Sequence, residues 1–167
     1  AGAPAVWSYG HRNVQGLYYD AATGTLYETE HGPKGGDELN LVTPGTNYGW
    51  PEITYGVNYD GTIITNKTEA EGMAQPLTYW VPSIAPSGLV MLTSDVYPGW
   101  KGDLFTGGMN GPAGLELTRI DMENGEVVGK QSLFDGEYPI RDVVQGPDGH
   151  LYVATKDFDG IFRVDIA

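Results

Sequence analysis

The chain has 167 residues, of which 40% are hydrophobic and 11% aromatic, so it is long enough to bury a core and has the size of one domain. Its formal net charge is −13 with only nine Lys and Arg, which argues against a nucleic-acid partner, because phosphate binding needs a basic face. It has no cysteine and no apolar run of membrane-spanning length, so neither a disulfide framework nor a membrane span is predicted.

Short strand-like runs joined by glycine and proline turns follow one another along the chain. In chain order they are GLYYD (16–20), GTLYET (24–29), LVMLTS (89–94), GDLFTGG (102–108), DVVQG (142–146), HLYVATK (150–156) and IFRVDIA (161–167). No segment keeps a helical period, and residues 69–73 could form one helical turn at most. The sequence therefore predicts an all-β protein.

Three hairpin-like units recur, and each places a glycine before x-Leu-aromatic, at Gly24, Gly102 and Gly149. Glycine supplies the positive φ that a tight hairpin needs. Three similar antiparallel units favour a radial repeat such as a propeller, although an antiparallel sandwich also repeats in this way. Three blades alone would expose two apolar faces, which an N-terminal half, a second copy or an unlike partner could cover.

Six ordered motifs identify a family: GHRNVQGL (10–17), ETEHGPKGGDELN (28–40), GTNYGWP (45–51), YWVPSIAPSG (79–88), WKGDLFTGG (100–108) and RDVVQGPDGHLY (141–152). Over nearly its whole length the chain resembles the C-terminal half of soluble PQQ-dependent aldose sugar dehydrogenases, the glucose/sorbosone dehydrogenase family. The resemblance implies a six-bladed β-propeller that carries pyrroloquinoline quinone (PQQ) over its central channel, with calcium. Residues 1–167 would then form one partial propeller of about three blades, made of antiparallel sheets.

The stretch HGPKGGDELN suits calcium, because a glycine-rich loop exposes backbone carbonyls and two carboxylates, Asp37 and Glu38, follow it. On the residues alone, a glycine turn followed by solvated carboxylates is the favoured interpretation, and the family resemblance reverses that preference. The resemblance implies that the carbonyls of Gly32 and Pro33 hold the calcium that bridges to the quinone. It also implies that Glu38 and the carbonyl of Tyr48 hold a second, structural calcium.

Arginine and asparagine can pair with the carboxylates and carbonyls of PQQ. The resemblance implies that Arg12, Asn13 and Arg141 contact the cofactor. The chain departs from the family pattern at two positions: Pro139 stands where the family has a second arginine, and Asn110 lies where the family tends to have a lysine. Both departures remove positive charge that the family uses for the cofactor.

General-base catalysis needs a group whose pKa lies near the working pH, usually a histidine. The resemblance places that base in the N-terminal half, and none of the three histidines, His11, His31 and His150, matches it. We therefore predict that the isolated chain is inactive. The resemblance also puts Tyr79 and Trp80 at the sugar entrance, although packing between blades is an equally open interpretation.

Two functions follow. The first is part of a PQQ- and calcium-dependent aldose sugar dehydrogenase, which oxidises the C1 hydroxyl of sugars and passes the electrons to an external acceptor. The alternative is a non-catalytic, calcium-binding half-propeller, which could complete itself as a homodimer and bind a sugar or another small ligand. A complementary half-propeller is the other partner that the first function implies. The resemblance implies a periplasmic or secreted bacterial location.

Overall fold

The computed structural model describes residues 5–111 and 114–166, in which strands and loops make up the fold. The strands are β1 (Val14–Asp20), β2 (Thr25–Glu30), β3 (Asp37–Val42), β4 (Thr78–Trp80), β5 (Pro86–Met91), β6 (Leu104–Gly108), β7 (Leu117–Glu123), β8 (Glu126–Leu133), β9 (Ile140–Gln145), β10 (Leu151–Thr155) and β11 (Ile161–Arg163). Within these two ranges, no helix is long and apolar enough to cross a membrane.

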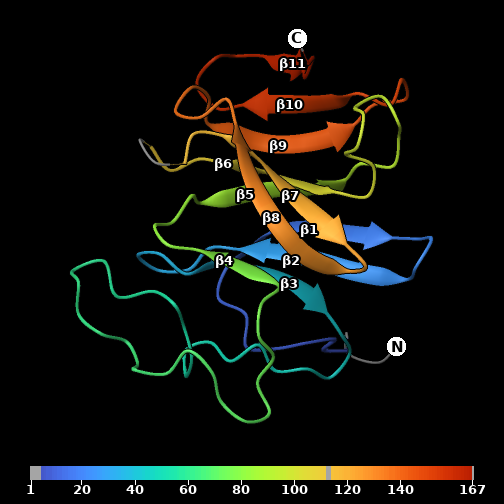
Figure 1. The fold of residues 1–167 in the computed structure, drawn as a ribbon. Helices are drawn as coiled ribbons and strands as arrows, with labels where there is room; N and C mark the ends of the chain where they lie inside the picture. Colours follow the sequence, from blue (N-terminus) through green and yellow to red (C-terminus); the bar gives the residue numbers. More distant parts are fainter. Residues whose placement is uncertain (1–4, 112–113, 167) are drawn as a thin grey trace.

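The strands form three successive antiparallel sheets that lie face to face (Figure 1). The first sheet has the order β1-β2-β3-β4, the second β5-β6-β7-β8 and the third β11-β10-β9. The first strands of the three sheets are neighbours, since β5 contacts both β1 and β9. This arrangement of meanders around a common inner edge is that of propeller blades. The prediction of about three antiparallel blades is confirmed.

Each gap between neighbouring sheets holds its own apolar core. Between the first and second sheets the buried residues are Tyr27, Leu39, Trp80, Ile84, Leu89, Leu104 and Ile120. Between the second and third sheets they are Val90, Leu92, Tyr97, Phe105, Leu117, Ile140, Val143, Leu151, Val153 and Val164. The second sheet is therefore buried on both faces, and it holds the other two in place.

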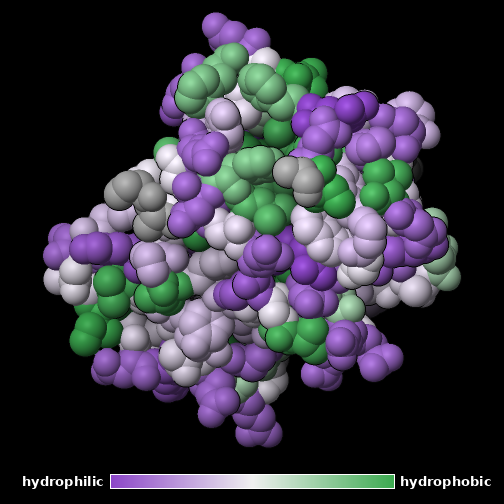
Figure 2. Space-filling model, turned by 45° about the horizontal axis from the view of Figure 1, so that its top comes forward, coloured by the Kyte–Doolittle hydropathy of each residue, from purple (hydrophilic) through white to green (hydrophobic). Residues whose placement is uncertain are grey.

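The outer faces of the first and third sheets carry apolar side chains at the surface. Leu17 and Tyr19 alternate with the inward-facing Tyr18 and are 63% and 60% exposed, and Val144 and Ile161 of the third sheet are 52% and 76% exposed. Figure 2, which turns the top of Figure 1 forward, shows hydrophobic side chains at the surface in that upper region. The expectation that a three-blade unit exposes apolar faces agrees with this pattern.

The hairpin glycines behave as expected, because Gly24, Gly102 and Gly149 have φ of 75°, 95° and 86°. The long connection 43–77 contains no strand of its own and packs as loops beside the first sheet (Figure 1). Its Tyr48 and Ile53 are buried, and the Tyr48 hydroxyl donates to the carbonyl of Leu41 in β3. This connection supplies one side of the site described next.

The beginnings of the three inner strands lie at one end of the molecule. The backbone N–H of His31 donates to the carbonyl of Asn13 (2.9 Å), and the His31 ring Nε2 bonds the carbonyl of Pro86 (2.7 Å). Ser87 Oγ then donates to the carbonyl of Ile140 (2.7 Å). These bonds join the starts of β1, β5 and β9, so their flanking loops form one polar end.

Candidate functional site

The loop between β2 and β3, residues 31–36, is compact because its glycines admit close backbone contacts. A Cβ on Gly32 would lie 2.3 Å from the carbonyl oxygens of Gly35 and Gly36, and Gly36 has a φ of 74°. Lys34 and Val57 bond each other through both backbone groups and fix the loop to the 43–77 connection. The loop is thus held in one conformation, and it cannot carry larger side chains at these positions.

The carbonyls of Gly32 and Pro33 are available as ligands. Within residues 5–111 and 114–166, neither oxygen accepts a hydrogen bond from a backbone or side-chain donor. The same holds for the carbonyl of Tyr48 among the described residues. Backbone carbonyls without a donor suit a hard cation such as calcium.

A groove of about 700 Å³ lies against this loop. Its lining consists of His31, Gly32, Pro33, Lys34, Gly35, Val57, Tyr59, Val81, Pro82, Ser83, Ala85 and Asn110. Residues 31–35 form one wall and residues 81–85 form another. The groove has the size of a small-molecule pocket.

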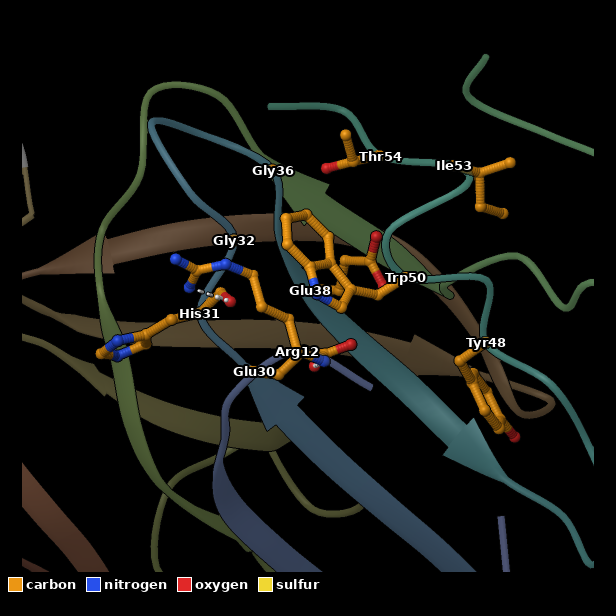
Figure 3. Close-up of a pocket in the computed structure, with 10 residues that line it drawn as sticks. All are labelled: Arg12, Glu30, His31, Gly32, Gly36, Glu38, Tyr48, Trp50, Ile53 and Thr54. Atoms are coloured by element: carbon orange, nitrogen blue, oxygen red, sulfur yellow. Dashed lines mark hydrogen bonds between the residues drawn. The ribbon is translucent and has the colours of Figure 1, made fainter. Parts of the chain in front are cut away.

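Arg12 and Asn13 are positioned by a buried carboxylate. Glu30 Oε2 accepts hydrogen bonds from the backbone N–H groups of Arg12 (2.5 Å) and Asn13 (3.1 Å). The Arg12 guanidinium donates to the carbonyl of His31 (3.0 Å) and lies 5.3 Å from the ring centre of Trp50. Figure 3 shows Arg12 beside Trp50, directly over the end of β2. The guanidinium therefore stands next to the glycine loop.

A small cavity lies under Arg12 (Figure 3). Its volume is about 10 Å³, which is room for about one water-sized particle. Its lining includes the acidic residues Glu30 and Glu38 together with Thr54 and Tyr48. Residues that carry oxygen donors around a space for one particle fit a calcium ion.

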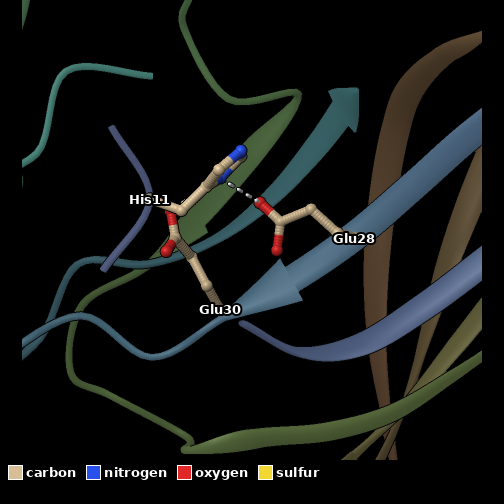
Figure 4. A group of neighbouring side chains, drawn as sticks. All are labelled: His11, Glu28 and Glu30. Atoms are coloured by element: carbon tan, nitrogen blue, oxygen red, sulfur yellow. Dashed lines mark ion pairs between the residues drawn. The ribbon is translucent and has the colours of Figure 1, made fainter. Parts of the chain in front are cut away.

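Three glutamates share one face of the first sheet, because Glu30 pairs with Glu38 across β2 and β3, and Glu28 pairs with Asn40. The amide of Asn40 donates to Glu28 (2.8 Å) and Glu38 (3.2 Å). His11 Nδ1 lies 3.4 Å from Glu28 and 3.9 Å from Glu30, between the two carboxylates (Figure 4). Negative charge is therefore concentrated beneath the surface here.

The local electrostatics favour a cation. Burial raises the pKa of Glu38 to about 7, and burial likewise raises the pKa of Glu28. The neighbouring carboxylates of Glu28 and Glu30 raise the pKa of His11 to about 9. Positive charge from an imidazolium or a metal ion would offset the cost of burying these carboxylates. One ligand atom each from His11, Glu28 and Glu30 lies within 4.8 Å of the others, which is metal-ligand spacing.

Sequence reasoning named Glu38 but missed Glu28, Glu30 and the role of His11. The signal was present in TLYETE, since residues i and i+2 of a strand face the same side. His11 could not be assigned from the sequence, because a 17-residue separation joins it to Glu28 only through the fold.

The predicted residues divide between two places. Arg12, Asn13, Gly32, Pro33, Glu38 and Tyr48 come together at one corner of the first sheet. Arg141 is an exposed residue of β9 in the third sheet, and the carbonyl of Pro139, two residues earlier, accepts a hydrogen bond from the backbone of Lys156. Asn110 lines the groove and donates to the carbonyl of Ser83 (2.8 Å).

Tyr79 and Trp80 have different environments. Tyr79 is 42% exposed and its ring stacks on Tyr55 with centroids 3.8 Å apart, whereas Trp80 is 7% exposed and belongs to the core between the first two sheets. Lys130 Nζ lies 4.6 Å from the centre of the Trp80 ring. The lining of the groove by Val81, Pro82 and Ser83 comes from the residues directly after this pair.

Each of the three histidines already has a partner. His11 contacts Glu28 and stacks on Tyr48 (4.5 Å), and His31 bonds the carbonyl of Pro86. His150 lies 3.1 Å from Asp148 on the β9–β10 hairpin, at the other end of that sheet from Arg141.

The fold and these groups define the class of protein. It is an antiparallel propeller fragment whose polar end has an oxygen-rich, cation-favouring corner beside a groove. The family model for glucose/sorbosone dehydrogenase matches residues 1–164. The chain belongs to the glucose/sorbosone dehydrogenase family.

Individual relatives are consistent with this family assignment. The aldose sugar dehydrogenase YliI of Escherichia coli is 42% identical over 159 residues, which cover 93% of this chain and 42% of the relative. A crystal structure of a glucose dehydrogenase superposes with a TM-score of 0.90 at 42% identity, over 99% of this chain and 48% of that one. The PQQ-bound aldose sugar dehydrogenase of Streptomyces coelicolor gives a TM-score of 0.68 at 32% identity, over 93% and 40%. The chain thus spans about half or less of the length of these relatives.

Proposed function

We propose that this chain forms the calcium and cofactor side of a PQQ-dependent aldose sugar dehydrogenase. The reaction is oxidation of the C1 hydroxyl of an aldose, with the electrons passing to an external acceptor. The observation that carries the proposal is the corner in which Arg12 bonds His31, beside a groove lined by His31, Gly32 and Pro33, where the last two have open carbonyls. The cofactor class is supported by the PQQ-bound relative, which has the same fold over 93% of this chain.

Two calcium ions are part of the proposal. The carbonyls of Gly32 and Pro33 would bind the calcium next to the cofactor, and Glu38 with the carbonyl of Tyr48 would bind a structural calcium. Support comes from the absence of hydrogen-bond donors to these carbonyls within the described residues and from the particle-sized cavity beside Glu38. The raised pKa of Glu38 gives a reason for the second ion, since a metal would hold this carboxylate ionised.

PQQ, when bound, supplies an electrophilic quinone that accepts a hydride. The residues of this chain bind and orient it: Arg12 and Asn13 from the first sheet, and Arg141 from the third. Arg12 is already fixed by His31 and Trp50, so little side-chain entropy is lost on pairing with an anion. Pro139 and Asn110 stand where the family pattern has positively charged residues. We therefore propose that this chain binds the carboxylates of PQQ more weakly than the family pattern would.

We assign the sugar contact to Tyr79, with Trp80 as its support. The Tyr79 ring is accessible and is stacked on Tyr55, which gives an aromatic surface suited to the C–H face of a sugar. The buried Trp80 fixes the backbone from which Val81 enters the groove. The substrate proposed is therefore an aldose, bound beside Tyr79, which lines a second pocket of about 560 Å³ that shares Val81 and Pro82 with the groove.

We further propose that the isolated 167-residue chain does not turn over sugar. His11 contacts Glu28, His31 bonds a backbone carbonyl and His150 contacts Asp148. None of the three is therefore placed to act as a base in the groove. A working site would then need a complementary half-propeller. A periplasmic or secreted setting is also proposed, and it rests on the family resemblance alone.

One observation favours the second candidate, a calcium-binding half-propeller that completes itself as a homodimer. Both outer sheet faces expose apolar residues, Leu17 and Tyr19 on one side and Val144 and Ile161 on the other. Such faces call for a covering surface, either the complementary half or a second copy. Sedimentation of the purified chain separates these: a monomer argues against the homodimer, and a stable dimer supports it.

The decisive experiment titrates the purified chain with PQQ, with and without calcium, and follows the cofactor's absorbance. We expect saturable, calcium-dependent binding that weakens in Arg12→Ala. Arg163→Ala serves as the matched control, because Arg163 lies on β11 and pairs with Asp165. Absence of binding at millimolar calcium would contradict the proposed role of this chain. A dye-linked assay with glucose tests the second part, since turnover by the chain alone would contradict the predicted inactivity.

A further inference from the structure

Asp37, the first residue of β3, is completely buried, and its carboxylate accepts four hydrogen bonds. Oδ1 accepts from the backbone N–H of Gly32 (2.9 Å). Oδ2 accepts from the hydroxyl of Ser83 (2.7 Å) and from the backbone N–H groups of Ile84 (2.8 Å) and Ala85 (2.9 Å). These donors occupy the carboxylate from two directions, so Asp37 differs from its neighbour Glu38 and is not available as a calcium ligand.

The four donors come from the two walls of the groove. Gly32 belongs to the loop whose carbonyls are proposed to bind calcium, and Ser83 and Ala85 belong to the opposite wall. Ala85 has a φ of 51°, a left-handed conformation that a residue with a Cβ adopts only when the surroundings hold it. The bond from its N–H to Asp37 is one of the contacts that hold it.

A third segment, at Asn110, is hydrogen-bonded to Ser83 and Ile84. Asn110 donates from its side chain to the carbonyl of Ser83 (2.8 Å) and from its backbone to the carbonyl of Ile84 (3.0 Å). Asn110 also lines the groove. The Asp37 carboxylate is thus the junction of three segments that are far apart in the sequence, residues 32–36, 83–85 and 110.

We propose that Asp37 is a positioning residue for the calcium and cofactor site. It touches neither ligand. It sets the distance between the Gly32–Pro33 carbonyls and the 83–85 wall, so that the groove is formed before calcium and PQQ arrive. Hydrogen bonds to an ionised carboxylate are the stronger kind, which suits a junction that must stay rigid. This inference rests on the proposed function.

The test compares Asp37→Asn with a matched control, Asp103→Asn. Asp103 is also a buried aspartate (2% exposed) that accepts bonds from Arg119 (2.6 Å) and the backbone of Met122 (3.1 Å). It precedes β6, at the end of the second sheet away from the groove. Both substitutions remove a buried charge and keep the side-chain size, so both lower stability. Only the first alters the groove.

Two readouts separate position from stability. The first is the dissociation constant for PQQ in saturating calcium, which we expect to rise about tenfold or more in Asp37→Asn, the effect of losing charge-assisted contacts, and to stay within about twofold in Asp103→Asn. The second is amide hydrogen exchange at Gly32, Ile84 and Ala85, which we expect to accelerate in Asp37→Asn alone. Equal affinities in the two variants would overturn the proposal.

The two readouts also distinguish this inference from the proposed function. If the unchanged chain binds no PQQ, the proposed function fails, and exchange alone decides whether Asp37 holds the two walls together. If Asp37→Asn does not fold, Ser83→Ala removes one of the four bonds and leaves the backbone donors in place. This milder variant should weaken PQQ binding about twofold to fivefold with a nearly unchanged midpoint of unfolding. An unchanged dissociation constant there would count against the proposal.

Discussion

The first and third sheets meet the same polar end of the molecule in different ways. At the first sheet, Glu28, Glu30 and Asp37 are buried and hydrogen-bonded, and they fix a loop and an arginine beside the groove. At the third sheet, Arg141 is exposed and follows Pro139 by two residues. The difference teaches that the first sheet holds its polar groups in a preformed framework, whereas the third sheet, to which we assign one cofactor contact, offers an exposed charge without a comparable framework.

The buried carboxylates at the first sheet have a cost, because they are like charges taken out of water. The structure compensates with His11, the Asn40 amide and backbone donors. A calcium ion would add to that compensation. The third sheet has no such cluster among the residues that the structure describes, which accounts for its simpler strand ends.

The largest effect that tests this contrast comes from the cores. Leu39→Ala in the gap between the first two sheets should lower the free energy of unfolding by about 2–5 kcal/mol, since the side chain is fully buried. Ile161→Ala on the open face of the third sheet should change it by less than about 0.5 kcal/mol. Urea unfolding of both variants measures this. Similar losses would mean that another surface covers the third sheet in solution.

The next effect concerns polar contacts. Glu30→Ala leaves the backbone N–H groups of Arg12 and Asn13 without their acceptor and should cost about 2–4 kcal/mol. Gln145→Ala removes a half-buried side chain that likewise accepts two bonds, both from Thr93, but these bonds are open to solvent, so the change should cost less than about 0.5 kcal/mol. Chemical denaturation again provides the measurement. A small loss in Glu30→Ala would show that Arg12 is not fixed through its backbone.

Much of this fold could be predicted from the sequence, because the signals are local. Gly24 and Gly149 mark hairpins by the need for positive φ, and the apolar run in LVMLTS marks a strand, which the structure places at Pro86–Met91. The polar corner of the first sheet was harder to predict. Asp37 and Glu38 are adjacent and chemically alike, yet alternation turns one toward segment 83–85 and the other toward Tyr48. The sequence does not show which side of β3 is buried, because segment 83–85, which covers the Asp37 side, begins 46 residues after Asp37.

The aromatic pair at residues 79 and 80 illustrates the same limit. A sequence names both residues as candidates for a sugar surface, but strand alternation exposes Tyr79 and buries Trp80. Which of the two faces water depends on the second sheet, whose Lys130 lies over the Trp80 ring. Periodicity gives the alternation, and only the packing of the sheets gives its direction.

The pH dependence of stability tests the cation-favouring corner. The pKa of His11 is raised to about 9 by Glu28 and Glu30, so its stabilising contribution is complete below its ordinary pKa of 6.5 and is lost as the pH rises to 9. The pKa of Glu38, raised to about 7, acts in the same sense between pH 4.5 and 7, because the folded chain binds the proton more tightly. In calcium-free buffer the midpoint of thermal unfolding should fall from pH 6.5 to 9.

The control for this prediction is His11→Gln, in which the fall above pH 6.5 should shrink. Calcium should raise the midpoint more at pH 8 than at pH 5, because a metal bound to Glu38 must displace its proton at the lower pH. A midpoint that rises with pH in the calcium-free chain would contradict the description of the corner as an excess of buried negative charge.

The smallest effect is expected at the third sheet. Arg141→Ala should weaken PQQ binding by only about twofold, because an exposed guanidinium is screened by solvent and must lose side-chain entropy to pair with a carboxylate. Arg12, which is already bonded to His31 and lies over Trp50, should matter more by a clear margin. Absorbance titrations at low and high salt measure both variants, and the small effect of Arg141→Ala should vanish at high salt. A loss at Arg141 as large as that at Arg12 would mean that binding organises the third sheet as fully as the first, and that the two sheets differ only before the cofactor arrives.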